Sequence, residues 1–180
     1  MNSNISIKLY NLIKTGVIKT NVHFWKSFYN EDYINTFPCD LQALEQELKE
    51  KGINVISVFD NTFPVVGVKL KNSERPFFFA YRGDITLLNN ADKNVAVIGV
   101  LTPTNEIVER EEKVVKSLTE KGLNIVSGLA KGCDTVAHSE SVKNNAKTIA
   151  FLPSTIENIY PKEIEEFIYT HPAVQDVQVI

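Results

Sequence analysis

Residues 124–138, NIVSGLAKGCDTVAH, combine an apolar run, a glycine-rich turn and the start of a helix. The run NIVS is apolar and β-branched, which is typical of a buried strand. Gly128 and Gly132 permit a tight turn, and either Asp134 or Thr135 is suited to cap the helix that follows. The stretch therefore predicts a strand, a loop and a helix of an α/β protein.

The same alternation continues on both sides of this stretch. NVAVIG at 94–99 is a second apolar run, a charged helix is expected over 106–121, and TIAFLP at 148–153 follows a helix that ends near residue 144. Strand, helix, strand, helix, strand indicates a parallel sheet with right-handed crossovers. We therefore predict an α/β fold, an extended Rossmann-like and doubly wound sheet that is mostly parallel.

The N-terminal part of the chain carries more helical patterns. Apolar residues at helical spacing predict two short helices within residues 5–30, with aromatic side chains in the core of a small helical cap. Asp40 is expected to begin a further helix. The apolar runs at 53–59 and 77–81 are typical of strands.

The composition is that of a globular protein, with 180 residues, 43% of them hydrophobic, and a net charge of −3. This slight acidic excess argues against a broad nucleic-acid-binding face, so any anion site is expected to be local. Cys39 and Cys133 match neither a zinc spacing nor a disulfide framework. Because no signal peptide or membrane span is evident either, we expect a cytoplasmic protein without metal or cofactor.

Ligands of parallel sheets bind beyond the carboxyl ends of the strands, so the loops at that edge are the candidate sites. The loop that begins at Gly99 has neither the GxGxxG dinucleotide pattern nor the GxxxxGK[ST] pattern. The loop over 127–132 can cradle a phosphate with the amides of the following helix, and Lys131 adds a cation. The alternative interpretation is that its glycines only permit tight packing and that Lys131 is solvated.

Other polar residues lie close to these loops in sequence. Lys147, just before a strand, is expected to reach the same anion, and Tyr160 either stacks on a base or packs in the core. His138 follows Asp134 by one helical turn, but a structural hydrogen bond suits it better than a catalytic dyad. Cys133 is interpreted as a small buried thiol. We therefore expect no enzymatic activity.

Two motifs resemble those of a known family, the DNA-processing protein A family (DprA, also called Smf). SGLAKGCDTVAH resembles its SG-[LM]-A-[RK]-G-x-D-x-x-AH signature, and KTIAFLPSTIENIYPKE resembles its GKTIAVL and IYPxEN segment; the likeness spans roughly residues 45 to 165. The resemblance implies a protein that binds single-stranded DNA, often as a dimer. It also implies a role in loading the recombinase RecA during natural transformation or recombination.

The resemblance, together with the loop patterns, defines a predicted phosphate pocket. The predicted nucleic-acid-binding residues are Gly99, Ser127, Gly128, Lys131, Gly132, Lys147 and Tyr160. The family's first loop normally reads G-[ST]-R with a DNA-contacting arginine, but Leu101 stands at that place here. Losing a charged phosphate contact costs on the order of 1 to 3 kcal/mol, so we expect weak, salt-sensitive DNA binding.

The domain organisation also departs from the family. We assign residues 1–40 to an N-terminal helical segment and residues 41–180 to the Rossmann-like domain, with no C-terminal winged helix. The tail, YPKEIEEFIYTHPAVQDVQVI, is instead similar to the opening of the small domain of acyl-CoA ligases. From that likeness we expect only a helix and an edge strand, VQDVQVI, which is a candidate homodimer contact.

Two other functions compete with DNA binding. The wider fold superfamily includes nucleotide-sensing modules, so the pocket is also compatible with a free nucleotide. A degenerate scaffold that keeps the fold but has lost DNA binding is the third possibility, and Leu101 is the residue that favours it.

Overall fold

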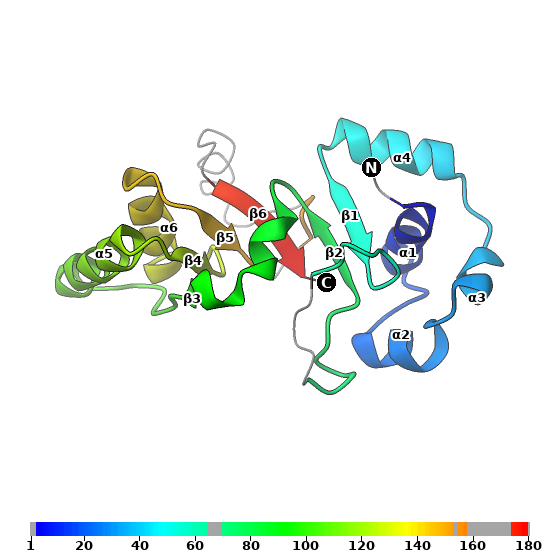
Figure 1. The fold of residues 1–180 in the computed structure, drawn as a ribbon, viewed down its shortest axis with the longest axis horizontal. Coiled ribbons are helices and arrows are strands. Elements are labelled where there is room, and N and C mark those ends of the chain that lie inside the picture. Colours follow the sequence, from blue (N-terminus) through cyan, green and yellow to red (C-terminus); the bar gives the residue numbers. More distant parts are fainter. Residues whose placement is uncertain (1–2, 65–69, 153–154, 158–173, 180) are drawn as a thin grey trace. The chain divides into compact units, whose positions relative to one another are not determined.

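The computed structural model describes residues 3–64, 70–152, 155–157 and 174–179. The chain divides into two compact units, an N-terminal unit of residues 1–82 with 179–180 and a C-terminal unit of residues 83–178 (Figure 1). The division therefore lies after Arg82 and not after residue 40, where we predicted it. The reason is that the helix beginning at residue 41 packs against the first helix of the chain and buries Leu48 completely.

The N-terminal unit has four helices and two strands in its described part: α1 (Asn4–Lys14), α2 (Asn21–Ser27), α3 (Glu31–Asn35), α4 (Leu41–Glu50), β1 (Asn54–Ser57) and β2 (Phe78–Tyr81). The two strands are antiparallel, with Val55 opposite Ala80. Asp40 caps α4 as predicted, because its carboxylate accepts a hydrogen bond from the Ala43 N–H at 3.0 Å. Helix α3 was not predicted.

Aromatic side chains fill the core of this unit. The rings of Phe24 and Phe77 stack with their centroids 3.9 Å apart, and both side chains are buried. Trp25 lies beside them, and its indole N–H donates to the carbonyl of Arg75, whose guanidinium covers the indole ring. The aromatic residues of α2 therefore form a core, as the sequence predicts.

The C-terminal unit contains a parallel sheet flanked by helices. Its elements are η1 (Ile85–Asn89), η2 (Ala91–Lys93), β3 (Asn94–Ala96), α5 (Asn105–Glu120), β4 (Asn124–Ser127), α6 (Cys133–Lys143), β5 (Thr148–Ala150) and β6 (Val174–Val179). The parallel strands lie in the order β6-β5-β4-β3. Helices α5 and α6 pack against β4 and against each other, with Val115, Ile125 and Ala137 fully buried (Figure 1). The predicted α/β fold with a mostly parallel, Rossmann-like sheet is confirmed.

Two segments of this unit differ from the prediction. The stretch LLNNADKN, which the sequence indicates as a simple connector, contributes to the two 3-10 helices η1 and η2. The tail does form a strand, β6, and this strand pairs with β5 of the same chain, with Val174 opposite Thr148. Among the described residues, no helix is long and apolar enough to cross a membrane.

Candidate nucleic-acid interface

Two loops meet at the carboxyl edge of the parallel sheet, one after β3 and one after β4. The N–H of Cys133 donates to the carbonyl of Val100 at 3.1 Å and joins them. A Cβ atom on Gly99 would lie 2.5 Å from the Cys133 sulfur, and one on Gly132 would lie 2.4 Å from the Val100 oxygen. Both positions therefore require glycine, because any side chain would push the loops apart.

The predicted loop residues do come together at this edge. Ser127 ends β4, and its hydroxyl donates to the carbonyl of Val97 at 2.7 Å. Gly132 has a φ of +85° and occupies the N-cap position of α6, so it turns the chain into the helix. Gly99, Ser127, Gly128 and Gly132 thus lie together at this edge, in a region that we call the loop surface and define as residues 98–101 and 127–132. The Ser127 side chain itself is buried.

Asp134 does not cap α6 through its side chain but holds the preceding loop. One carboxylate oxygen accepts hydrogen bonds from the N–H groups of Gly128 and Ala130, each at 3.2 Å. The hydroxyl of Thr135 donates to the Ala130 carbonyl at 2.8 Å. The prediction that Asp134 or Thr135 is the N-cap is wrong, because Gly132 holds that position. Two amides of the loop that precedes the helix therefore already bind the protein's own carboxylate.

The charge at the loop surface is mixed. Lys131 is exposed and makes no ion pair with any carboxylate in the described part of the chain. Leu101, at the place of the family's arginine, is 65% exposed, and Ile98 beside it is 78% exposed. Beneath the surface, the carboxylates of Asp134 and Glu111 oppose an anion. The loop surface therefore presents one cation, Lys131, beside exposed apolar side chains and above two carboxylates.

Neither Cys133, as a nucleophile, nor His138, as a base, is arranged for catalysis. The nearby Glu111 carboxylate and burial raise the pKa of the Cys133 thiol, which keeps it in its unreactive form. His138 is fully buried, and its Nδ1 contacts the hydroxyl of Thr148 at 2.7 Å. Both observations agree with the structural roles that the sequence predicts for these two side chains.

Lys147 lies away from the loop surface, and the prediction that it reaches the same anion is wrong. It immediately precedes Thr148, the first residue of β5, so it stands at the amino edge of the sheet. The loop surface lies beyond the carboxyl ends of β3 and β4. In a parallel sheet these two edges are opposite. This position could have been predicted from the sequence, because Lys147 comes before its strand and not after it. Tyr160 lies outside the described residues.

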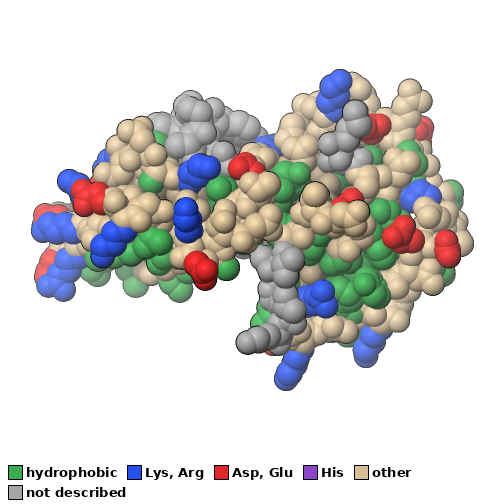
Figure 2. Space-filling view, viewed as in Figure 1, with side chains coloured by type: hydrophobic (Ala, Val, Ile, Leu, Met, Phe, Trp, Pro, Cys, Tyr) green, Lys and Arg blue, Asp and Glu red, His purple; other side chains and the backbone are tan. Residues whose placement is uncertain are grey.

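The charged side chains of the visible face do not gather into a basic stripe. Figure 2 shows Lys and Arg side chains mixed with Asp and Glu side chains over α5. The ion pairs of this helix explain the mixture: Arg110 pairs with Glu106 at 2.6 Å, and Lys143 of α6 reaches Glu112 at 3.4 Å. A narrow anion site therefore fits this face better than a broad one.

Residues 44–175 match the family described as DNA recombination-mediator protein A. The DNA processing protein DprA of Bacillus subtilis is 33% identical over 72% of this chain and 43% of its own length. Protein Smf of Borreliella burgdorferi is 30% identical over 90% of this chain and 52% of its own length. The chain thus spans about half the length of the curated relatives it matches.

Solved structures agree with this assignment. DNA processing protein A of Streptococcus pneumoniae superposes with a TM-score of 0.63 over 98% of this chain and 62% of its own, at 24% identity. The DNA processing protein A of Helicobacter pylori, whose structure was described for its single-stranded DNA binding mode, has a TM-score of 0.57 at 25% identity, covering 70% of this chain and 54% of its own. A separate match covers 24 residues that are 79% identical to YngI of Bacillus subtilis, named as an acyl-CoA synthetase, and corresponds to 13% of this chain and 4% of that protein.

Proposed function

The chain belongs to the DNA recombination-mediator protein A family, and from this membership we propose that it binds single-stranded DNA through the loop surface. The observation that carries the proposal is Lys131, an exposed cation of the family's loop motif at the carboxyl edge of the sheet, which pairs with no carboxylate among the described residues. This is the edge where ligands of parallel α/β sheets bind. Lys131 is the main phosphate contact in this proposal.

The binding we propose is weak and sensitive to salt. Gly128 and Ala130 direct their N–H groups to Asp134, so these amides are not free for a phosphate. Leu101 provides no charge where the family has arginine. Because Lys131 is the one cation among the residues that define the loop surface, the affinity depends on few released counterions and stays in the range of non-specific binding.

Membership of the family is the basis for a wider role of the chain in the cell. We infer a supporting role in recombination and natural transformation, in the cytoplasm, with loading of RecA and homodimerisation as the associated interactions. The activity is binding without turnover. The buried Cys133 and the buried His138 support this view, because neither side chain is available to a substrate.

Fluorescence anisotropy with a labelled oligothymidine tests the central claim. At low salt, Lys131→Gln should weaken binding about tenfold, and the slope of log affinity against log salt should fall by about 0.7. Lys113→Gln removes an exposed charge from α5, away from the loop surface, and should leave affinity nearly unchanged. Absence of binding at low salt, or equal losses in the two variants, would overturn the proposal.

One observation favours a second candidate, a scaffold of this family that has lost DNA binding. The Asp134 carboxylate fills the loop where an anion would otherwise lie, and Leu101 is a second departure from the family pattern. This candidate predicts a folded chain without oligothymidine affinity at any salt concentration. The anisotropy titration therefore separates the two candidates directly.

A further inference from the structure

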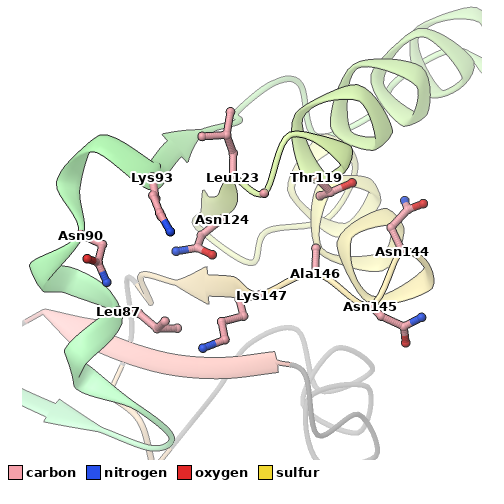
Figure 3. Close-up of a pocket in the computed structure, with 11 residues that line it drawn as sticks. Leu87, Asn90, Lys93, Thr119, Leu123, Asn124, Asn144, Asn145, Ala146 and Lys147 are labelled. Carbon is pink, nitrogen blue, oxygen red and sulfur yellow. The ribbon is translucent and has the colours of Figure 1, made fainter.

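A polar cavity of about 360 Å³ lies in the C-terminal unit at the amino edge of the sheet, opposite the loop surface (Figure 3). Its lining combines two lysines, several asparagines and a few apolar side chains. The residues that carry the argument are Leu87, Asn90, Lys93, Leu123, Asn124 and Lys147. None of its described lining residues is acidic. Its volume is near the lower end of the range for small-molecule sites.

The strand register explains why two lysines converge here. Asn94 pairs with Asn124, and Ile125 pairs with Thr148, so Lys147 stands beside Asn124 on the neighbouring strand. Lys93 directly precedes Asn94. The backbones of the two lysines are therefore about two strand spacings apart, roughly 10 Å, which two lysine side chains can bridge to one anion. Figure 3 shows both side chains extending into the cavity from the two sides of Asn124.

Hydrogen bonds hold the backbone and the floor of the cavity in place. The Lys93 N–H donates to the Asn90 carbonyl at 2.9 Å, and the Lys147 carbonyl accepts from Ile125 at 3.2 Å. The amide of Asn124 donates to Asn94 at 2.9 Å, and Asn94 donates in turn to the Leu87 carbonyl. A site that is already ordered loses little entropy when a ligand binds.

The charges of the cavity favour an anion. Neither Lys93 nor Lys147 forms an ion pair with any carboxylate in the described ranges. The acidic side chain whose charge reaches Lys147 is Asp84. One oxygen of this carboxylate, Oδ1, accepts hydrogen bonds from the N–H and the hydroxyl of Thr86. The cavity thus holds two ammonium groups with no acidic group in its lining, in contrast to the loop surface.

We propose that this cavity binds a small phosphate monoester of mononucleotide size. The phosphate lies between the ammonium groups of Lys93 and Lys147, where charge-assisted hydrogen bonds hold it. The side-chain amides of Asn90 and Asn124 supply further polar contacts, and Leu87 and Leu123 provide apolar surface for the organic part. The site is separate from the proposed DNA contact, because Lys131 lies at the other edge of the sheet.

Isothermal titration calorimetry with thymidine monophosphate tests this site. Lys93→Gln and Lys147→Gln should each weaken binding about tenfold, and thymidine, which lacks the phosphate, should not bind. Both lysines are exposed, so both variants are expected to stay folded, which circular dichroism verifies. Lys113→Gln, an exposed lysine outside the cavity, is the matched control and should bind like the unmodified chain.

The outcomes distinguish this site from the proposed DNA contact. Lys131→Gln should leave the affinity for thymidine monophosphate unchanged, whereas it should weaken binding of the oligothymidine. Inorganic phosphate should bind more weakly than the nucleotide, because it lacks the organic part. The proposal is overturned if thymidine monophosphate fails to bind at millimolar concentration, if neither lysine variant weakens it, or if inorganic phosphate binds as tightly.

Discussion

The imidazole of His138 donates its Nδ1 proton to the hydroxyl of Thr148, 2.7 Å away in the core of the C-terminal unit. The direction of this hydrogen bond follows from a third group, the carbonyl of Ile125. Thr148 donates its only hydroxyl proton to the Ile125 carbonyl at 3.0 Å, so the hydroxyl can only accept from the imidazole. The opposite nitrogen, Nε2, is buried without a hydrogen-bond partner in the described structure. Protonating Nε2 would place an unpaired charge in the core.

The free energy of unfolding should therefore decrease over a defined range of acidic pH. Burial lowers the pKa of His138 from 6.5 to about 4. Between these two values the unfolded chain takes up a proton that the folded chain refuses, so the free energy of unfolding decreases as pH falls from 6.5 to 4. The full effect is on the order of 3 kcal/mol, and urea unfolding at several pH values measures it.

Carboxylates also titrate in this pH range, so the contribution of His138 to the pH dependence of stability has to be measured against a variant that lacks it. His138→Gln, which cannot take up the proton, should show a shallower loss of stability between pH 6.5 and 4. Equal slopes for His138→Gln and the unmodified chain would contradict the assignment.

Gly132→Ala should destabilise the chain far more than Gly122→Ala. Both glycines have a positive φ, +85° and +75°, which costs an alanine roughly 1 to 2 kcal/mol. At Gly132 the new methyl group would also lie 2.4 Å from the Val100 oxygen, whereas at Gly122 it meets nothing within 4 Å. We expect an additional loss of about 2 kcal/mol or more at Gly132. Urea denaturation compares the two variants, and similar midpoints would show that the loops separate easily.

Asp134→Ala should destabilise the C-terminal unit by roughly 1 to 3 kcal/mol, because it leaves the N–H groups of Gly128 and Ala130 without their acceptor. Asp134→Asn keeps an oxygen in the same place and should lose less. Thermal unfolding of the two variants measures the difference. An equal loss in the two variants would show that the carboxylate charge, and not the mere presence of an acceptor oxygen, holds the loop.

Leu101→Arg should strengthen binding of single-stranded DNA if the loop surface is the contact. The side chain is 65% exposed, so the change should cost little stability. One new charge-assisted phosphate contact is worth about a tenfold gain in affinity at low salt. Leu101→Gln, which removes the apolar side chain without adding charge, is the control in the anisotropy assay. A gain shared by both variants would mean that the charge is not responsible.

The order and type of most elements in the C-terminal unit could be predicted from the sequence. The apolar runs at 94–99 and 148–153 are too short for helices, so strands of a parallel sheet were the solution they favoured. The second run forms the buried strand β5, whereas the first forms the edge strand β3, whose residues are half-buried or exposed. The glycines at 128 and 132 marked the turn between β4 and α6. These are local properties, because propensity, periodicity and turn geometry depend on near neighbours in the chain.

The contacts that the polar groups of these elements make depend instead on the folded chain. Asp134 turned toward the amides of its own loop, and Gly99 proved necessary because Cys133 lies against it. Lys147 and Lys93 lie at the same amino edge because of the register in which β3, β4 and β5 pair. Such contacts join residues far apart in the chain. They depend on packing and strand pairing, which no local pattern of residues specifies.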